Sequence, residues 1–412
     1  MYFIPSFVKE TQKSDGLYIS SPLYDNTVCL DEPYSKQYFF IKENRCSDLT
    51  GELPAFLHEQ SLLFSKEELR KEVEKIKEKL SRSLQITMMP TEACNFRCPY
   101  CYESHDNFTM SPKLVERIKE FIGNKIDNGE LDSVLISWFG GEPTLCSEYV
   151  VDVNRFVLEK IKEKEIYFSS SMTTNGYLLD VDSFKMYYNV GVTNYQITLD
   201  GWNHDKTRPL VSGKGSLQVI LDNLKAISSL PADYDFSVMI RHNILNGDED
   251  YTWYDYLKEL FGKDKRFSIL IRPVGDMGGE TVKQLDLVKD DELVKRHARY
   301  VSSIGLSNKN ESMDCTTQPG KKVCYAATPN GYIFRADGRI HKCSVILDSP
   351  INCVGRVDEG NGVVIDEEKN KLWYEETIHE KCYACEEILS CLNKVCPRNR
   401  LMNQCQYSCS RK

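Results

Sequence analysis

The sequence predicts an α/β protein built on a partial (β/α)6 TIM-like barrel, preceded by an α+β segment and followed by a cysteine-rich extension. Three observations carry this prediction. Strand-like and helical patterns alternate from residue 84, a charged helical run ends the segment before them, and cysteines crowd the residues after 306. We therefore expect domains at residues 1–83, 84–306 and 307–412.

The first segment contains two strand-like pieces and a helix. The pieces are "GLYIS" (16–20) and "KQYFFIKE" (36–43), and the helical run is "SKEELRKEVEKIKEKL" (65–80). They allow a small recognition domain of winged-helix type, and they equally allow a cap that covers the barrel.

The middle segment repeats one unit, a buried strand followed by a helix. Parallel strands need such crossovers, so we expect a parallel sheet with helices outside it. Six units are fewer than the eight of a closed barrel. The expected strands are "LQITMMP" (84–90), "SVLISWFG" (133–140), "IYFSSSMTT" (166–174), "YQITLD" (195–200), "FSVMIRHNI" (236–244) and "FSILIRPV" (267–274). The clearest helical patterns are at 111–126, 147–163, 216–227 and 252–262.

Composition excludes several classes of partner. The net charge is −9, whereas a nucleic-acid surface needs clustered Lys and Arg. The first residues, "MYFIPSFVKE", lack the basic start and apolar run of a signal peptide. No stretch approaches the roughly 18 apolar residues of a membrane helix. We expect a cytoplasmic protein with no nucleic-acid and no membrane partner.

Cysteines are numerous and unevenly placed. Of the 16 in the chain, three stand at 94–101 and ten lie between 315 and 409. A disulfide framework requires an oxidising compartment, for which the sequence gives no sign. Clustered thiols in a reducing compartment indicate metal or iron–sulfur ligands.

The first group of cysteines is spaced C-x3-C-x2-C, at Cys94, Cys98 and Cys101 in "TEACNFRCPYCYE". It follows the first expected strand, where parallel α/β folds place their functional loops. A closed zinc site has four protein ligands, and no second cysteine pair follows within forty residues. Three ligands leave one coordination place for something else.

The second expected strand ends in "WFGGEP", which contains Gly140, Gly141 and Glu142. Paired glycines let a ligand approach the backbone, and a carboxylate can face a cationic group. A plain turn is the alternative explanation for this motif taken by itself.

Together the two motifs resemble the signature of the radical S-adenosylmethionine (SAM) family. The signature is C-x3-C-x-aromatic-C, here with Tyr100 as the aromatic, followed by Gly-Gly-Glu after the next strand. The resemblance implies a [4Fe–4S] cluster on the three cysteines, with SAM bound to the fourth iron. It also implies that reductive cleavage of SAM gives a 5′-deoxyadenosyl radical, which abstracts hydrogen from the substrate.

Further strand ends supply residues that the resemblance places near SAM. "TTNG" (173–176), "TLDG" (198–201) and "HDKTR" (204–208) are similar to family motifs, and each residue has a turn or capping role as its alternative. Arg208 suits the SAM carboxylate, Arg241 is a further candidate, and His204 is expected to be structural. The predicted SAM-contact residues are Gly140, Gly141, Glu142, Thr174, Asn175, Thr198, Asp200, Arg208 and Asn243.

The cysteine-rich tail resembles the SPASM extension, C-x(9–15)-G-x4-C, then C-x2-C-x5-C-x3-C, then a late cysteine. Four residues instead of three precede Cys396, which leaves ligand assignment open there. The resemblance implies two auxiliary [4Fe–4S] clusters, with Cys353 a spare thiol. One set is Cys315, Cys324, Cys343 and Cys396, and the other is Cys382, Cys385, Cys391 and either Cys405 or Cys409.

SPASM-type relatives mostly modify peptides. We predict a maturase that acts on a precursor peptide and installs a thioether or carbon–carbon crosslink, or epimerises a residue, with a ferredoxin or flavodoxin as reductant. One alternative is an anaerobic sulfatase maturase that forms formylglycine, which would carry an Asp base where this chain has Ser344. A second is an inactive iron–sulfur scaffold that binds a partner protein.

Overall fold

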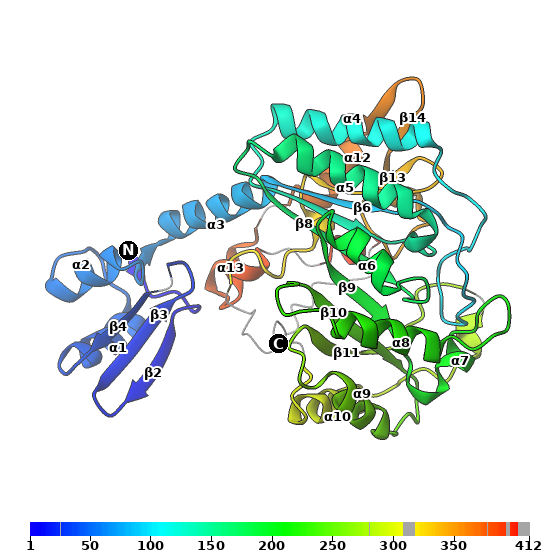
Figure 1. Ribbon diagram of the computed structural model, residues 1–412. Coiled ribbons are helices and arrows are strands. Elements are labelled where there is room, and N and C mark those ends of the chain that lie inside the picture. The colour runs from blue at the N-terminus through cyan, green and yellow to red at the C-terminus, as the bar shows by residue number, and fades with distance from the viewer. Residues whose placement is uncertain (25, 280, 308–317, 377, 393–395, 403–412) are drawn as a thin grey trace. The chain divides into compact units, whose positions relative to one another are not determined.

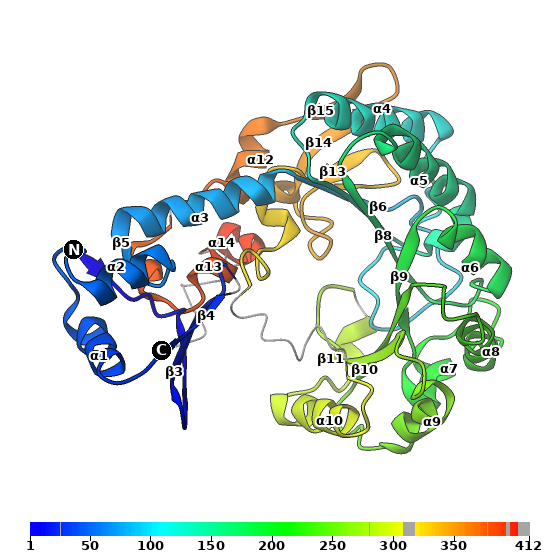
Figure 2. The same ribbon diagram turned by 60° about the vertical axis from the view of Figure 1, so that its left-hand side comes forward.

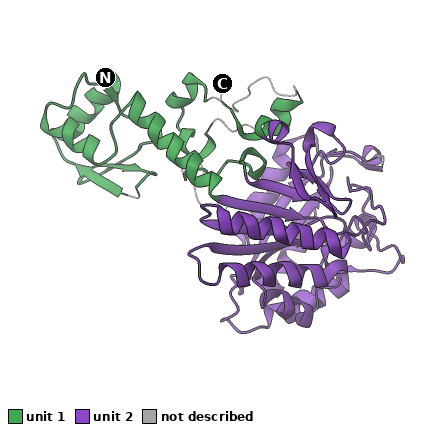
Figure 3. Cartoon of the chain, turned by 90° about the horizontal axis from the view of Figure 1, so that it is seen from above, with its two compact units in different colours: residues 1–82, 313–329, 371–412 green, residues 83–312, 330–370 purple. Residues whose placement is uncertain are grey.

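The computed structural model describes residues 1–412 apart from 25, 280, 308–317, 377, 393–395 and 403–412. The chain forms two compact units, coloured separately in Figure 3. The first unit comprises Met1–Arg82, Met313–Pro329 and Lys371–Lys412, and the second comprises Ser83–Ser312 and Asn330–Asn370. The segment expected to be one cysteine-rich domain is thus divided between the two units.

A sheet of ten strands runs through the second unit (Figures 1 and 2). The six strands that alternate with helices are parallel, β12 joins them in parallel, and the last three strands are antiparallel. The predicted α/β class with a parallel sheet is confirmed, and no closed barrel forms among the described strands. In sheet order they are β11 (Phe267–Pro273), β10 (Ser237–Ile244), β9 (Val192–Thr198), β8 (Tyr167–Thr174), β7 (Ser133–Trp138), β6 (Ser83–Met88), β12 (Gly331–Phe334), β13 (Arg339–His341), β14 (Cys353–Asp358) and β15 (Gly362–Ile365).

Helices cover the outer face of the curved sheet, as Figure 2 shows. Helix α4 begins where the sequence signals it. Ser111 accepts a hydrogen bond from the Leu114 amide at 3.2 Å, and Pro112 occupies the first helical position. The α-helices and 3-10 helices are α4 (Pro112–Asn128), η1 (Pro143–Cys146), α5 (Ser147–Ile161), α6 (Val181–Tyr188), η2 (Gly201–Asn203), α7 (His204–Thr207), α8 (Leu217–Ser228), α9 (Thr252–Phe261), η3 (Thr281–Gln284), α10 (Asp291–Ser303), η5 (Pro350–Asn352) and α12 (Glu367–Tyr374).

The burial pattern of strand β6 shows why this segment forms a strand of a covered parallel sheet. Every second side chain of β6, namely Leu84, Ile86 and Met88, is buried, and the intervening side chains are half-buried. Two covered faces are typical of a parallel sheet between helices and a filled interior. The carboxyl ends of β6 to β10 meet at one edge, where the loops that follow them gather.

Part of the predicted extension continues the sheet. Strand β12 pairs with β6 in parallel, Gly331 opposite Gln85, and all four of its residues are buried. Tyr332 and Phe334 pack edge-on against Phe121 at ring-centroid distances of 5.6 and 5.7 Å. The sequence pattern missed these strands because they are too short for a clear period.

The first unit contains an antiparallel sheet in the order β2-β3-β4, and β1 pairs with β5. Its late cysteine segment shares a core with the N-terminal residues: Ile388, Leu389 and Leu392 belong to one buried cluster with Leu57 and Val73. Its elements are β1 (Tyr2–Phe3), β2 (Lys9–Lys13), β3 (Gly16–Ser21), β4 (Asn26–Leu30), α1 (Tyr34–Asn44), α2 (Glu52–Glu59), β5 (Phe64–Ser65), α3 (Lys66–Ser81), η4 (Tyr325–Ala327), η6 (Glu380–Ala384), α13 (Ile388–Cys391) and α14 (Pro397–Leu401).

One expectation for this unit is wrong. Residues 36–43, "KQYFFIKE", belong to helix α1 and form no strand. Tyr38 and Ile41, three residues apart, point into the core, whereas Phe39 and Phe40 are exposed. Burial of one helical face outweighs the β propensity of the aromatic residues. The helix predicted at 65–80 is confirmed as α3, which Ser65 and Glu68 begin with a reciprocal capping box.

No helix in the described part of the chain is long and apolar enough to cross a membrane.

Candidate active site

The three cysteines of the first motif lie in the loop that follows β6, and all line one cavity of about 360 Å³ in the second unit. Burial raises the pKa of the Cys94 thiol to about 11 and that of Cys101 to about 12. Such thiols stay protonated until a metal site displaces the proton. We call this space the cofactor cavity.

The cofactor cavity also collects most of the residues predicted to contact SAM. Asp200 is the exception, because it lines a neighbouring cavity of about 530 Å³. The predicted residues that line the cofactor cavity are Gly140, Gly141, Glu142, Thr174, Asn175, Thr198, Arg208 and Asn243, and Arg241 joins them. Their contact with SAM stays a prediction.

The glycine pair serves the packing of one loop on another. Gly140 has φ of 108°, and a Cβ there would lie 2.7 Å from the Thr91 carbonyl oxygen. A Cβ on Gly141 would lie 2.2 Å from the carbonyl oxygen of Ala93. The Gly141 amide donates to Thr91 O at 3.0 Å. The two glycines therefore leave room for the backbone of the cysteine loop, which packs against them. The sequence motif alone did not indicate this role.

Glu142 is buried and joins two strand ends. Its Oε1 accepts from the Thr144 hydroxyl at 2.7 Å and from the Thr174 hydroxyl at 2.6 Å. Its Oε2 accepts from the Asn175 amide at 2.8 Å. These donors fix the position of the carboxyl group, so a ligand cation would meet preorganised oxygens.

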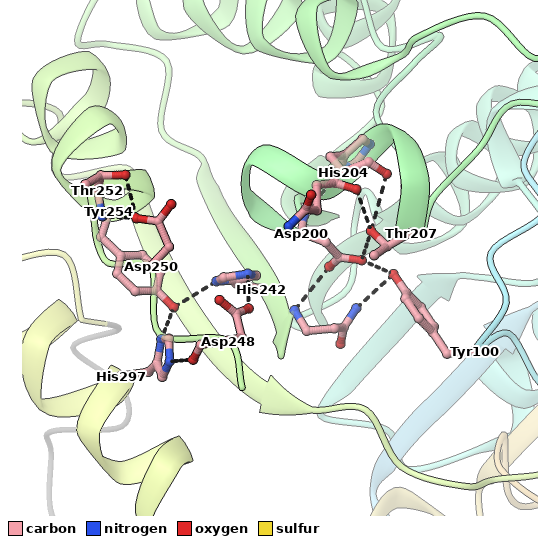
Figure 4. Close-up of polar contacts among 12 residues, drawn as sticks. Tyr100, Asp200, His204, Thr207, His242, Asp248, Asp250, Thr252, Tyr254 and His297 are labelled. Carbon is pink, nitrogen blue, oxygen red and sulfur yellow. Dashed lines mark hydrogen bonds and ion pairs between the residues drawn. The ribbon is translucent and has the colours of Figure 1, made fainter. Parts of the chain in front are cut away.

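Tyr100 ties the cysteine loop to the ends of β9 and β10. Its hydroxyl donates to Asp200 Oδ2 (Figure 4) and accepts from Arg208 Nη1 at 2.9 Å and Asn243 Nδ2 at 3.3 Å. The Asn243 amide donates to Asp200 Oδ1 at 3.2 Å. Sequence reasoning treated Tyr100 only as the aromatic of the motif, and its hydroxyl network is a feature of the tertiary structure.

Arg208 keeps one donor unused. It is nine-tenths buried, and its Nε has no hydrogen-bond partner among the described residues. Its guanidinium lies 5.6 Å from the ring centroid of Phe96. A buried guanidinium with a spare donor in a cavity suits a carboxylate ligand.

His204 lies behind this group. Its Nδ1 accepts from the Asp200 amide at 3.2 Å, and burial lowers the pKa of its imidazole to about 4. The neutral imidazole accepts the Asp200 amide and so holds the backbone at the end of β9. This contact suits the structural role expected for His204.

Glu103 is a cavity residue that sequence reasoning missed. Burial raises the pKa of its carboxyl to about 7, against the lowering effect of Arg335. Both of its oxygens are buried with no hydrogen-bond partner among the described residues. Nearby, Arg335 Nε donates to Glu92 Oε1 at 2.9 Å in a buried ion pair. The position of Glu103, two residues after Cys101, was the only sequence signal.

The predicted auxiliary ligands are held by local contacts. Asn352 is fully buried; its Oδ1 accepts from the Cys343 amide at 2.8 Å, and its Nδ2 donates to the Cys343 carbonyl at 2.7 Å. The Cys385 amide donates to Cys382 O at 3.0 Å within the C-x2-C turn. Cys324, Cys391 and Cys396 are described, and Cys315, Cys405 and Cys409 lie outside the described residues.

The donor set fits an iron–sulfur cluster with SAM. Three thiols face one cavity that also presents a buried carboxylate and a buried guanidinium with a spare donor. No group of three or more His, Cys, Asp or Glu among the described residues is spaced for a single metal ion. A four-iron cluster is larger than one ion, so its ligands stand farther apart.

Comparison with known proteins agrees with this geometry. Residues 88–260 match the Radical SAM superfamily. The chain therefore carries a radical SAM domain, the catalytic domain of a superfamily of enzymes, as the two motifs predicted. The cofactors that go with this domain are SAM and a [4Fe–4S] cluster.

Solved structures show the same fold. Streptococcus suis SuiB bound to S-adenosylmethionine covers 97% of this chain and 96% of its own, with 15% identity and a TM-score of 0.51. SuiB has also been solved bound to the precursor peptide SuiA, with a TM-score of 0.51. Native anSMEcpe with bound AdoMet and Kp18Cys peptide covers 75% of this chain and 88% of its own, with 17% identity and a TM-score of 0.54.

The curated sequence relatives include several GTP 3',8-cyclases. GTP 3',8-cyclase of Haemophilus ducreyi is 29% identical over 32% of this chain and 37% of its own length. A probable GTP 3',8-cyclase of Saccharolobus solfataricus is 26% identical over 65% and 84%. A Staphylococcus aureus GTP 3',8-cyclase is 27% identical over 54% of this chain and 64% of its own.

Proposed function

We propose that this chain is a radical SAM maturase of a precursor peptide. The observation that carries the proposal is the convergence of Cys94, Cys98, Cys101 and Arg208 on one cavity. The fold of SuiB corresponds to 97% of the chain, so the correspondence extends beyond the radical SAM domain. SuiB has been solved with a precursor peptide, which supports a peptide substrate here. A thioether or carbon–carbon crosslink is the favoured modification, and epimerisation is the alternative.

The chain's own residues would bind and orient the cofactors. The three thiols would hold the cluster, Arg208 would pair with the SAM carboxylate through its unused donor, and Glu142 would face the SAM ammonium. When bound, SAM and the reduced cluster supply the radical that abstracts hydrogen from the substrate. The Tyr100 network would keep the cysteine loop in register with the strand ends.

Two auxiliary clusters complete the proposal. Two of their predicted ligands, Cys382 and Cys391, lie in the short helices η6 and α13 of the first unit, and Cys385 directly follows η6. Cys343 is held by hydrogen bonds to Asn352. Clusters there would give electrons from the substrate a path away from the radical site. A ferredoxin or flavodoxin is the proposed external reductant.

The first unit offers an edge for the leader of the peptide. Strands β2 and β4 each pair only with β3 among the described strands. Strand β2, "KETQK", carries three charged residues, whereas β4, "NTVCL", carries none. Charged edges resist pairing, so β4 is the edge on which an added strand would form.

The decisive experiment uses the anaerobically reconstituted full chain. Under reducing conditions it should release 5′-deoxyadenosine from SAM, and it should change the mass spectrum of a candidate peptide encoded beside its gene. A crosslinked product is lighter by a pair of hydrogen atoms. Absence of SAM cleavage would instead support the inactive scaffold.

Parallel assays separate the competing substrates. One assay uses GTP, the substrate in the names of the sequence relatives. Another uses a sulfatase-derived peptide and tests formylglycine formation. Conversion of either, with the candidate peptide unchanged, would overturn the proposal. Formylglycine formation would call for an acid–base carboxylate at the position of Ser344, which lines the cofactor cavity. The serine therefore favours modification of the candidate peptide over formylglycine formation.

Proline variants test the β4 edge. The backbone amides of neighbouring strand residues point to opposite edges of the strand. Of Thr27→Pro and Val28→Pro, one therefore removes an amide that points away from β3, and the other removes an amide that points toward β3. The variant that loses the amide pointing away from β3 should bind the candidate peptide more weakly with an unchanged melting temperature. Thr11→Pro and Gln12→Pro on β2 are the matched controls, and equal loss of binding from them would refute the assignment.

A further inference from the structure

A second cavity of about 530 Å³ lies beside the cofactor cavity in the same unit. It is bounded by the end of β9 with η2 and α7 on one side and by the loop between β10 and α9 on the other. Asn243 lines both cavities. Asp200 lines the second one and accepts a hydrogen bond from Tyr100 of the cysteine loop (Figure 4). A group bound there would be next to the proposed reaction site.

The charge of this cavity is negative. Four carboxylates line it, those of Asp200, Asp248, Glu249 and Asp250, and its described lining contains no lysine or arginine. We call it the acidic cavity. Glu249 pairs at 3.1 Å with Arg296, which is half-exposed and belongs to α10. A phosphate-bearing ligand would be repelled here, because it needs the cations that the lining lacks.

His242 does not neutralise the carboxylates. It is 2% exposed, and burial lowers the pKa of its imidazole to about 4, so the ring is uncharged near neutral pH. Its Nδ1 is bonded to the Tyr254 hydroxyl at 2.8 Å, and that hydroxyl is bonded to His297 Nδ1 at 2.6 Å (Figure 4). His242 lines the cavity, and the hydrogen bonds to Tyr254 and onward to His297 hold its ring in place from behind.

A second observation points to a ligand. Trp253 lines the acidic cavity and is 1% exposed, yet its indole Nε1 is buried without a hydrogen-bond partner among the described residues. An indole N–H in such a place normally has an acceptor, and a ligand carbonyl would supply one. Trp202, which is 49% exposed, also lines the cavity and packs edge-on against Trp253 at 5.0 Å.

The cation that fits is organic. No group of three or more His, Cys, Asp or Glu in the described part of the chain is spaced to hold a metal ion. The carboxylates are spread around a cavity large enough for a side chain together with its backbone. Asp250 is held in place by the Thr252 hydroxyl at 2.6 Å and the Thr252 amide at 2.9 Å, so binding would not have to order it.

We propose that the acidic cavity is a specificity subsite that takes an arginine or lysine side chain of the peptide substrate, with a neighbouring peptide carbonyl accepting from Trp253. The inference rests on the proposed peptide maturase activity and names a property of its substrate. A basic residue anchored there would place adjoining residues of the peptide at the cofactor cavity.

The test compares two blocked pentapeptides, acetyl-Ala-Ala-Arg-Ala-Ala-amide and the same peptide with citrulline in place of arginine. Citrulline keeps the shape and removes the charge. Anaerobically reconstituted full chain with SAM should bind the arginine peptide about tenfold more tightly, as expected for two partly exposed carboxylates. Tryptophan fluorescence or calorimetry measures both dissociation constants.

The variant Asp248→Asn/Asp250→Asn should abolish this preference while leaving SAM cleavage unchanged. Asparagine at residue 250 keeps an Oδ1 that can accept from the Thr252 amide and hydroxyl. Asp222→Asn/Asp235→Asn removes two exposed charges outside both cavities and should keep the preference. Equal binding of the two peptides by the unaltered chain, or an equal loss in the control variant, would overturn the subsite.

The two proposals fail in different measurements. A chain that releases no 5′-deoxyadenosine from SAM contradicts the proposed function, whatever it binds. A chain that cleaves SAM but binds arginine and citrulline peptides alike contradicts only the subsite. Trp253→Phe removes the donor and keeps the ring, so it should weaken both peptides equally and leave the charge preference intact.

Discussion

The two groups of cysteines are held by different kinds of structure. The first group lies in a single loop that is fixed by long-range contacts, such as the bond from Tyr100 to Asp200 and the packing of Gly141 against Ala93. The later cysteines that the structure describes are spread over both units, and Cys343, Cys382 and Cys385 are held by hydrogen bonds to residues near them in the chain. The first site therefore rests on packing between distant segments, whereas the described tail cysteines rest on contacts close in the chain.

The largest expected effect comes from removing the first group. Changing Cys94, Cys98 and Cys101 to Ala should abolish 5′-deoxyadenosine formation and leave the auxiliary iron in place, because the sites are chemically separate. Chromatography of the nucleoside product and an iron assay measure the two quantities. Cys146→Ala, at a buried cysteine outside the predicted ligand set, is the control. SAM cleavage by the triple variant would refute the assignment.

Removing tail ligands should have a different result. The intact chain should hold about twelve irons in three tetranuclear clusters, and Cys382→Ala/Cys385→Ala should hold about eight. We expect some SAM cleavage to survive while peptide modification fails. Full-rate modification without these clusters would show that they are only structural, and Cys353→Ala should lose no iron.

The last ligand of the tail can be identified in the same way. If Cys405 and Cys409 are alternatives, either single Ala variant keeps the cluster and the double variant loses it. A single variant that loses about four irons identifies the ligand directly.

A smaller effect is expected at Glu142, in the preformed site. Glu142→Gln keeps the size and removes the charge, so SAM affinity should fall by about 1.5–3 kcal/mol if the carboxylate meets the SAM ammonium. The melting temperature should also fall, since the new amide faces donors such as the Thr174 hydroxyl. Calorimetry with SAM separates the two effects, and unchanged affinity in a destabilised variant would leave Glu142 a purely structural role.

The smallest effect is expected from Tyr100→Phe. The variant keeps the aromatic ring and loses only the hydroxyl that bridges Asp200, Arg208 and Asn243. One bridging hydroxyl contributes on the order of 1 kcal/mol to stability. Thermal unfolding measures this loss, and an unchanged melting temperature would show that the network does not fix the cysteine loop.

Much of the fold could be read from local patterns. The six strands of the parallel sheet and the helix that begins at Ser65 follow from periodicity and capping, which are short-range properties. The same reasoning failed at residues 36–43, where an aromatic-rich run became helix α1. It also missed β12 to β15, which are short and stabilised by pairing with distant strands.

The sequence by itself identified the two motifs of the first site. Cys94, Cys98, Cys101 and the Gly140–Glu142 turn are contiguous motifs at strand ends, and strand ends of a parallel sheet converge on one edge whatever the remaining details.

Only the tertiary structure decided which buried groups lack partners and which charges share a cavity. Arg208 Nε, the Glu103 carboxyl oxygens and the Trp253 indole have no hydrogen-bond partner among the described residues, and this results from packing between distant segments. Burial and hydrogen bonding depend on every neighbour at once, so no local pattern records them. The acidic cavity is a feature of the same kind, because its carboxylates come from two loops about fifty residues apart in the chain.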